Sequence, residues 1–515
     1  MNPSTPRALA LTAALALLAP LWLASDASAR PGGGQSYSSH SSSGGSHSSS
    51  SSRSSSSSRS SSSSRGSSGS SRSYSGSSSH SSGGSGTDGV TLVLLLLVFG
   101  VVYGWSYISK RVEADTSFDT TRAPPPPLRK RASLAALQAR DRDFSAVLFE
   151  DFVYALYARV QAARSDPQAM AALAPYVDDK ARAALLVRSP AGVKIHGVII
   201  GKLQVIDVNL TDRARVHLLI SANYTAELEH GPQGYYIEER WVLERDLNVT
   251  SKPPVDVHSF QCPSCGGPYE RGDQGRCSRC AQVVEGGRFD WSLRSLRVLN
   301  QSPTPPTLTG DVEEQGTHLP TVLAANIDRQ FASFAASDPG ASAEAIDRRL
   351  REIYAALNTA WTTRDLRPVR PHVSDALYNY LSYWIDAYRA QGLQNVLAHM
   401  NISRTKIARL TRDHYYDAIT VRIWARGTDY TIRVADGHRV AGDPQRPRAY
   451  SEYWTLIRGA KVRGAPRTPG QCPNCGAPLD RVNMAGNCEA CGTHLTRGEF
   501  DWVLSKIEQD DDYTG

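Results

Sequence analysis

The eight cysteines are the residues of this chain whose type and spacing most clearly indicate chemistry. They form two sets with the patterns C-x2-C-x11-C-x2-C and C-x2-C-x12-C-x2-C. Two thiolates separated by two residues can face one ion from a tight turn, and two such turns complete a tetrahedron around zinc. The predicted zinc ligands are Cys262, Cys265, Cys277, Cys280, Cys472, Cys475, Cys488 and Cys491.

Each set therefore predicts a zinc ribbon with a structural ion, so that the chain carries two zinc ions. Four sulfur ligands leave no open coordination position for catalysis. Redox-active dithiols also use C-x-x-C, but they normally open a helix after a strand, and no such setting is visible around these cysteines. A ribbon of this size cannot bury a core, so we expect it to fold only with its metal.

The cysteine sets belong to a longer pattern that occurs twice, with a period of about 210 residues. Nine residues after the last cysteine of each set comes Phe-Asp-Trp, at 289–291 and at 500–502. Further matches between the copies are 175–179 with 371–375 and Trp241 with Trp454. The sequence thus predicts a duplicated module, an α+β domain followed by a zinc ribbon whose C-terminal edge is packed by Phe-Asp-Trp.

Hydrophobic periodicity predicts two helices and then several strands in each α+β domain. In the first copy the helices are expected at 143–163 and 178–187, and the strands at 202–208, 215–228 and 235–244. In the second copy the helices are expected at 346–365 and 374–390, and the strands at 402–410, 415–426, 430–434 and 449–457. Gly392 is a typical left-handed stop after the second helix.

Residues 89–109 form an uncharged apolar run between Asp88 and Lys110. As a helix this run spans roughly 31 Å, about the thickness of the hydrocarbon core of a bilayer. Aromatic residues gather near its C-terminal end and basic residues follow it, as at a membrane interface. A buried core helix is the alternative, but the length and the flanks favour a transmembrane helix.

The segments around this span predict the topology. Residues 1–29 have the form of a secretory signal peptide, and residues 30–88 are an exported Ser/Gly-rich segment that cannot bury a core. Residues 110–131 form a basic, Pro-rich juxtamembrane linker. The basic flank places everything after Lys110 in the cytoplasm, on the inner face of the cytoplasmic membrane. The remaining predicted segments are 132–255 (α+β domain, copy one), 256–300 (zinc ribbon), 301–340 (linker), 341–465 (α+β domain, copy two), 466–508 (zinc ribbon) and 509–515 (acidic tail).

The net charge of +7 is spread so thinly that it disfavours a nucleic-acid-binding domain. Six Arg and two Asp precede Lys110, and the remaining chain has 51 basic and 48 acidic residues. Nucleic-acid-binding domains normally present a clearly basic face. Lys461, Arg463 and Arg467, just before the second ribbon, are the only argument for that class.

The helix-helix-strand pattern resembles the Tim44-like domain. The residues that carry this resemblance are 350–357, 360–361, 365–366, 369–371, 374–377 and 388–395 in the second copy, and 149–163 and 175–186 in the first. The resemblance covers roughly residues 140–250 and 341–460. It implies a nuclear-transport-factor-two-like (cystatin-like) fold, in which a curved sheet is cupped by helices around an apolar pocket.

The resemblance also implies roles in tethering partner proteins or contacting the membrane. Bacterial membrane-anchored proteins that pair this domain with a zinc ribbon, described as transport-like, are similar in organisation. The mitochondrial import-motor scaffold that gives the domain its name has neither a zinc ribbon nor an exported Ser-rich tail, so its motor role does not transfer directly.

An enzyme of the isomerase or dehydratase type is the alternative, because the same fold class hosts such enzymes. A general acid or base would have to lie in the cup, yet the histidines of the two copies do not correspond. Those histidines are His196 and His217 in the first copy and His372, His399 and His414 in the second. Asp179 and Asp375 do correspond, but helix capping explains both.

The sequence therefore predicts a non-catalytic, membrane-anchored scaffold. Its two cytoplasmic cups hold partner protein segments or lipid at the inner membrane face, in a process such as protein transport. Tyr380 and Trp384, on the second helix of copy two, are candidates to line a cup.

Overall fold

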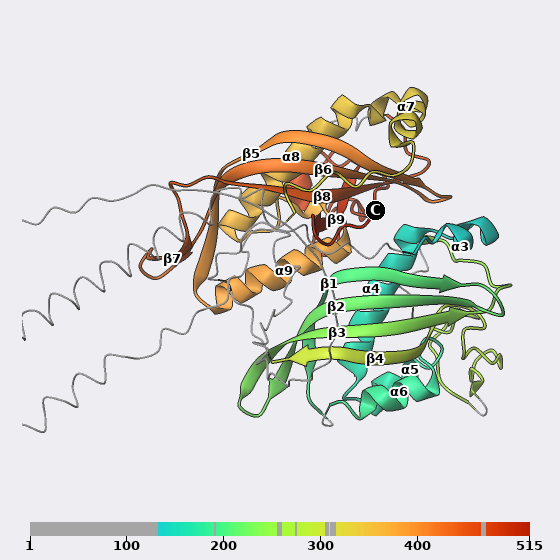
Figure 1. The fold of residues 1–515 in the computed structure, drawn as a ribbon. Coiled ribbons are helices and arrows are strands. Elements are labelled where there is room, and N and C mark those ends of the chain that lie inside the picture. The colour runs from blue at the N-terminus through green and yellow to red at the C-terminus, as the bar shows by residue number, and fades with distance from the viewer. Residues whose placement is uncertain are drawn as a thin grey trace, which may run out of the picture. The chain divides into compact units, whose positions relative to one another are not determined.

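The computed structural model describes residues 132–515 except 190–191, 255–259, 273–274, 304–307, 309–315 and 465–469. These residues belong to one compact unit with two antiparallel sheets and helices packed against them (Figure 1). The predicted signal peptide, Ser-rich segment, membrane span and juxtamembrane linker lie outside the described residues. Within the described ranges, no helix combines the length and apolar character that crossing a membrane requires. The predicted mixed α+β class is confirmed for this part of the chain.

The first module, residues 135–302, has four helices followed by one four-stranded sheet. Its helices are α3 (Ala135–Arg140), α4 (Ala146–Ala163), α5 (Pro167–Ala172) and α6 (Asp179–Leu186). Its strands are β1 (Ile195–Asn209), β2 (Ala214–Leu228), β3 (Gly231–Arg245) and β4 (Ser292–Ser302). They pair in the order β1-β2-β3-β4, and every pairing is antiparallel.

The second module, residues 327–509, has a similar order, with three α-helices and one small extra strand. Its helices are α7 (Ile327–Ser337), α8 (Ala343–Thr363) and α9 (Asp375–Ala390). Its strands are β5 (Leu393–Arg412), β6 (Tyr416–Arg433), β7 (Arg439–Gly442), β8 (Arg448–Gly459) and β9 (Val503–Gln509). The sheet order is β5-β6-β8-β9, and β7 pairs only with β6. Short 3-10 turns cover Pro339–Ala341, Arg370–His372 and Leu479–Arg481.

Side-chain caps explain where the long helices begin. Ser145 accepts a hydrogen bond from the backbone N–H of Leu148, so α4 begins at Ala146 and not at the predicted 143. Ser342 and Ser374 cap α8 and α9 in the same way. The apolar faces of α4 and α8 then pack against the two sheets, which buries side chains worth about 1.5–3 kcal/mol each.

Two predicted strands of the second module form one continuous strand, β6. Gly427, between them, allows a close approach of two strands, because a Cβ there would lie 2.1 Å from the sulfur of Met400 in β5. The strands β1 and β5 also extend further than predicted.

The edge strands of both sheets are bent at matching places. Strand β1 has register shifts between 196 and 199, 200 and 202, and 205 and 207. Strand β5 has shifts at positions that are all 202 residues later, between 398 and 401, 402 and 404, and 407 and 409. The first shift holds a residue with positive φ in both strands, Gly197 at +58° and His399 at +55°. Such bulges bend a strand and curve the sheet.

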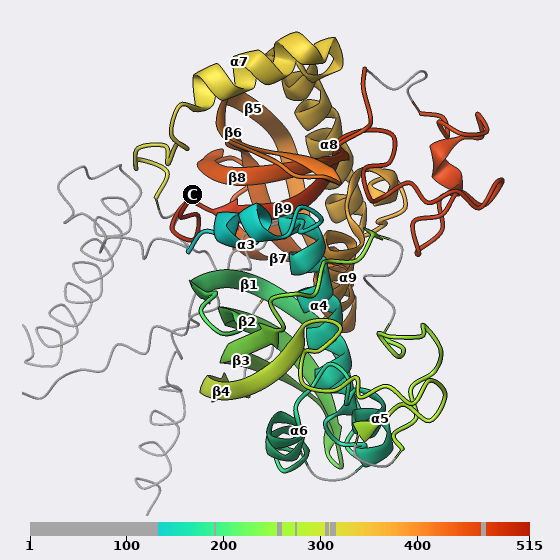
Figure 2. The same ribbon diagram turned by 90° about the vertical axis from the view of Figure 1, so that its right-hand side faces the viewer.

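The fourth strand of each sheet comes after the cysteines, which corrects the predicted order. Strand β4 pairs with β3, and β9 pairs with β8, so each cysteine segment interrupts its sheet between the last two strands. A parallel bridge from Val177 to Leu293 ties β4 to the start of α6, and Val373 to Leu504 does the same for β9 and α9. Figure 2 shows both cysteine segments as loops that leave the sheets and return.

In the first module, a buried arginine joins three separated segments. Arg245, at the end of β3, forms an ion pair of 2.9 Å with Asp141, the C-cap residue of α3. Its guanidinium lies 4.7 Å from the ring centre of Trp291, the last residue of Phe-Asp-Trp.

The second module has the same arrangement. Arg458, in β8, forms an ion pair of 2.5 Å with Asp338, the C-cap residue of α7, and lies 4.4 Å from the ring centre of Trp502. The Arg458 and Asp338 side chains are fully buried. We call each set of arginine, aspartate and tryptophan an arginine clasp. The tryptophan of Phe-Asp-Trp therefore packs in the sheet core. The prediction that the whole tripeptide packs on the ribbon is wrong for this residue.

The predicted linker and the acidic tail also differ from expectation. Residues 301–340 contain the end of β4 and all of α7. Arg422 of β6 donates to the carbonyl oxygens of Gly316, Thr317 and Leu319 and pairs with Asp510 at 3.0 Å. Tyr453 and Tyr513 stack with ring centres 3.8 Å apart. Parts of the linker and the tail are therefore packed on the second sheet.

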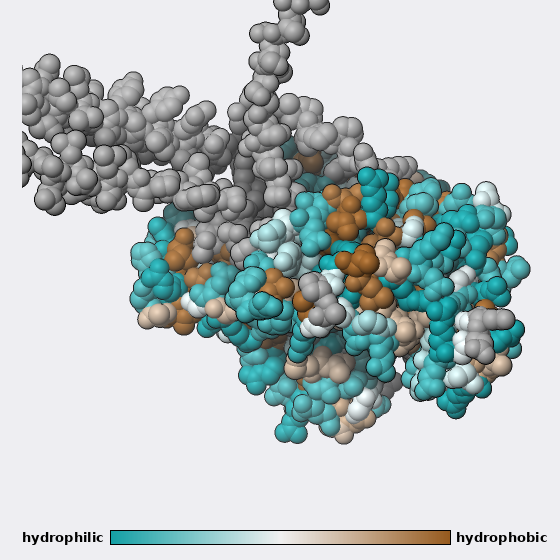
Figure 3. All heavy atoms as spheres, turned by 90° about the horizontal axis from the view of Figure 1, so that it is seen from below, coloured by the Kyte–Doolittle hydropathy of each residue, from teal (hydrophilic) through white to brown (hydrophobic). Residues whose placement is uncertain are grey.

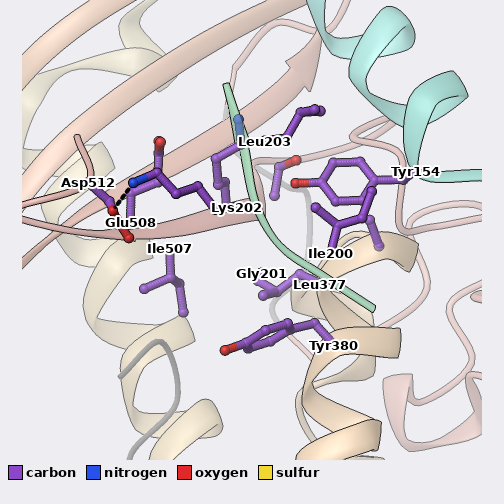
Figure 4. Close-up of a pocket in the computed structure, with 13 residues that line it drawn as sticks. Tyr154, Ile200, Gly201, Lys202, Leu203, Leu377, Tyr380, Ile507, Glu508 and Asp512 are labelled. Carbon is purple, nitrogen blue, oxygen red and sulfur yellow. Dashed lines mark hydrogen bonds and ion pairs between the residues drawn. The ribbon is translucent and has the colours of Figure 1, made fainter. Parts of the chain in front are cut away.

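The two modules contact each other through α9 and the β1 edge. A cavity of about 30 Å³ lies between them and is lined by Tyr154 and Leu203 on one side and Tyr380 and Ile507 on the other (Figure 4). Lys506 forms an ion pair of 2.5 Å with Glu150 across this contact. Tyr380 thus lines the cavity toward the first module, and both Tyr380 and Trp384 are buried in the second core. Their role in lining a cup stays a prediction.

The arginine clasp generates a stability prediction. Asp338→Ala leaves the Arg458 charge buried without its partner, which costs about 3–5 kcal/mol. Urea unfolding of the second module, followed by hydrogen exchange of its strands, should show this loss. Asp386→Ala removes an exposed partner of Arg389 and should change stability by less than about 0.5 kcal/mol. Equal effects of the two variants would contradict the role given to the clasp.

Candidate functional site

The first cysteine set is folded as two short turns that point at each other. In the first turn, Cys262 donates its N–H to Gly267 O at 2.8 Å, and Gly266 donates to Cys262 O at 2.9 Å. In the second turn, Ala281 donates to Cys277 O at 2.9 Å. The second set repeats this geometry, with Cys472 bonded to Ala477, Gly476 to Cys472, and Gly492 to Cys488.

These turns bring together the eight cysteines that the sequence selected. In each set the four sulfur atoms lie within 4.8 Å of one another. The distance is 3.8 Å for Cys262 to Cys280, for Cys472 to Cys491 and for Cys475 to Cys488. A tetrahedron of sulfurs around zinc has edges of about 3.8 Å, because the Zn–S bond is ~2.3 Å. A disulfide would need about 2 Å, so the residues present fit a four-coordinate metal.

Local hydrogen bonds favour the thiolate at the last cysteine of each set. The backbone N–H of Gln282 lowers the pKa of Cys280 to about 7. A hydrogen bond with the Thr493 hydroxyl lowers the pKa of Cys491 to about 6. The thiolate is the form that ligates metal, so each set has one sulfur already disposed to bind.

The turns require left-handed backbone at the position after each second cysteine pair. Gly492 has φ +71° after Cys491, whereas the equivalent position after Cys280 is Ala281 with φ +56°. A non-glycine residue in this region costs about 1–2 kcal/mol. The first ribbon therefore holds more backbone strain than the second.

The second ribbon is attached to the start of α9 by a partly buried polar cluster. Arg370, 2 % exposed, donates to Met484 O at 2.9 Å and pairs with Asp375 at 2.5 Å. Asp375 also accepts from the Thr496 hydroxyl at 2.8 Å, and His494 lies 3.5 Å from it. The cap of α9 is Ser374, so Asp375 serves the ribbon contact and not the capping that was predicted.

The first ribbon is fastened at the equivalent place. Asp178 caps α6, and Asp179 pairs with Arg271 of the ribbon at 3.4 Å. The Tyr176 hydroxyl donates to Gln261 O at 2.8 Å, and Phe260 stacks on Phe152 of α4 with ring centres 5.6 Å apart. Phe289 and Phe500 pack within the cysteine clusters, which agrees with the predicted edge role for the first residue of Phe-Asp-Trp.

Buried polar groups inside the cups were not anticipated from the sequence. Glu239 in β3 and Glu452 in β8 are both buried, two residues before Trp241 and Trp454. Each tryptophan contacts a tyrosine of the long helix, Tyr157 at 5.0 Å and Tyr354 at 5.8 Å between ring centres. The Glu-x-Trp pattern in matching strands was the available signal.

The comparisons with known proteins bear on the second module. The family model of the Tim44-like domain matches residues 327–467. This range begins with α7, includes β8 and ends before Cys472. The predicted resemblance is confirmed there, and for the first module it stays a prediction. No curated protein matched the chain. Tim44-like domains are generally non-catalytic binding domains associated with protein transport.

The paired sulfur sets predict the metal content. Purified full-length chain should contain one tetrahedrally coordinated metal ion per set, two in all, measured by elemental analysis. Cys265→Ser should remove one ion and expose the first ribbon to proteolysis, leaving the second ribbon intact. Ser264→Ala, next to that ligand, is the matched control and should keep both ions. Finding disulfides in place of metal in protein purified from cytosol would contradict the prediction of two metal sites.

The ribbon contact of the second module should depend on pH. Burial disfavours the charged form of His494, but hydrogen bonds to Asp375 and Glu499 outweigh it and raise its pKa to about 9. The contribution of this histidine to the free energy of unfolding is therefore complete below about pH 6.5 and is lost as the pH rises through about 9. The melting temperatures of wild type and His494→Gln should differ most at low pH and converge above pH ~9. A constant difference would contradict this assignment, and His196→Gln is the control.

Proposed function

We propose that this protein is a membrane-anchored, non-catalytic binding protein that holds partner protein segments or lipid at the inner face of the cytoplasmic membrane. The Tim44-like match over α7 to β8 is the observation that carries the proposal. Residues 89–109 supply the anchor, and residues 1–29 export the Ser/Gly-rich segment before it. The folded modules then lie on the cytoplasmic side.

The proposal includes an internal duplication. The equal spacing of the three register shifts in β1 and β5 supports it, as do the two arginine clasps. The curved sheets covered by α4 and α8 agree with a nuclear-transport-factor-two-like cup. Two copies on one chain raise the effective concentration for a partner with two matching segments.

The ions held by the cysteine sets are assigned as structural zinc. Thiolate sets of four are typical of zinc, and the sulfur spacing leaves no open ligand position. Because each ribbon interrupts a sheet, the metal would support the adjacent fourth strand as well as its own loop.

The alternative that the protein is an enzyme is less well supported, because it requires a suitably placed general acid or base. A general acid or base has to reach a substrate. Burial lowers the pKa of His372 to about 3, so this imidazole is neutral, and His196 pairs with Glu227 at 2.7 Å on the surface. In the second cup, Glu452 accepts from Trp454 and from Gln509.

Topology is tested with alkaline phosphatase fusions. A fusion after Ser82 should be active and a fusion after Arg131 inactive, because the enzyme folds only outside the cytoplasm. Activity at the second point would place the modules outside and contradict the proposed location.

Partner binding is tested by photo-crosslinking in native cells. Val434 is an exposed apolar residue, 47 % exposed, inside the Tim44-like match, and Leu299 is a matched exposed residue, 43 % exposed, in the first module. The face visible in Figure 3 is mainly hydrophilic, with apolar residues in small groups. An exposed apolar position is therefore a suitable place to test for partner contact. A photoreactive residue at 434 should capture a membrane protein or lipid more strongly than one at 299. Isomerase activity of the purified protein, together with the absence of any crosslinked protein or lipid, would favour the enzyme alternative.

A further inference from the structure

The interior of the first cup contains a chain of buried polar side chains that the metal sites do not use. Arg164, just after α4, donates to Gln161 Oε1 at 2.8 Å, and Gln161 donates to Glu239 Oε2 at 2.9 Å. Arg188, after α6, pairs with Glu239 Oε1 at 2.5 Å. Gln161 and Glu239 are fully buried, and the Arg188 side chain is 14 % exposed.

The charges of this chain do not cancel. Arg188 contacts the carboxylate of Glu239 directly, and Arg164 is linked to it through Gln161. Both guanidinium groups stay protonated in proteins, so this mostly buried set carries a net positive charge. An uncompensated charge in such a place is costly, and an anion next to it would offset the cost. Arg164 stacks on the Tyr224 ring at 4.5 Å, which fixes the orientation of its plane.

Three N–H donors in this interior are buried and make no hydrogen bond in the described structure: Arg164 Nε, Arg188 Nη2 and Trp241 Nε1. Trp241 lies two residues from Glu239 on the same face of β3, and both are fully buried. The donors thus belong to residues that follow α4 and α6 and lie on β3, each of them next to Glu239 or linked to it through Gln161. A buried donor without an acceptor is unfavourable, because it has lost its hydrogen bond to water without gaining another.

In the second cup the tryptophan donor of this framework is satisfied, whereas Asn358, at the helix position equivalent to Gln161, has a buried Nδ2 without a hydrogen bond among the described residues. There Trp454 Nε1 donates to Glu452 Oε2 at 2.9 Å, and Gln509 donates to Glu452 Oε1 at 3.0 Å. Trp361 occupies the helix position equivalent to Arg164 and donates to Asn395 at 2.9 Å. The first cup therefore has a guanidinium group where the second has an indole ring, and its own tryptophan donor is unsatisfied within the described part of the chain.

We propose that the first cup binds a small molecule through a carboxylate group that accepts from Arg164, Arg188 and Trp241. A planar carboxylate offers two oxygens to guanidinium and indole N–H groups, and charge-assisted hydrogen bonds of this kind are the strong ones. The adjacent rings of Tyr157 and Trp241 supply an apolar wall, which suits an aromatic or short aliphatic carboxylate. This site is additional to the proposed capture of partners at the membrane.

Titration calorimetry on the full-length chain in detergent, with benzoate as probe, tests the site. Benzoate should bind to one site, and benzyl alcohol, which lacks the charge, should not bind measurably. Inorganic phosphate should bind more weakly than benzoate. Absence of benzoate binding at millimolar concentration overturns the proposal, and phosphate binding as tight as benzoate overturns the carboxylate assignment.

Matched tryptophan variants locate the site. Trp241→Phe removes one N–H donor and keeps an aromatic ring, so it should weaken benzoate binding about tenfold. Trp454→Phe makes the same change in the second cup and should leave the affinity unchanged. Equal effects of the two variants overturn the assignment to the first cup. If near-ultraviolet circular dichroism shows that Trp241→Phe is misfolded, Arg164→Lys, which keeps the charge but lacks Nε, carries the same expectation.

Discussion

A buried guanidinium held between a carboxylate and an indole ring determines how each module closes. The arginine lies on a central strand, its aspartate ends the first helix of the module, and its tryptophan immediately precedes the strand that follows the cysteines. Three segments far apart in the chain must therefore be in place before the arginine charge is compensated. Breaking such a buried pair is strongly unfavourable, so the contact specifies one closed arrangement.

This constraint explains why the ribbons belong to the sheets. Each cysteine segment leaves after the third strand and returns through Phe-Asp-Trp, whose phenylalanine stays with the sulfurs and whose tryptophan enters the sheet core. The first ribbon is also fixed to α6 through Asp179, and the second to α9 through Asp375. A metal ion held by four cysteines would thus stabilise a sheet edge, and not only its own loop.

Much of this organisation was predictable, and the exceptions have physical reasons. Spacing alone selected the cysteines, because metal geometry is local, and the periodicity of α4, α8 and α9 reports packing that is also local. Strands β4 and β9 were assigned to the ribbons because their pairing partners lie across an insertion that sequence patterns do not register. Buried Arg245 and Arg458 were not anticipated, since arginine in a strand normally faces solvent. The donors around Glu239 depend on three elements meeting in space.

The central claim is that each metal-binding ribbon is an integral part of its sheet. The most direct test is hydrogen exchange measured before and after the metal is removed. On removal of metal from full-length chain by a chelator, the account predicts faster exchange in β4 and β9 and at the first turns of α6 and α9, as well as in the ribbons. Strands β2 and β6, in the middle of the sheets, should keep their protection. Faster exchange confined to the two cysteine segments, with β4 and β9 unchanged, would contradict the account.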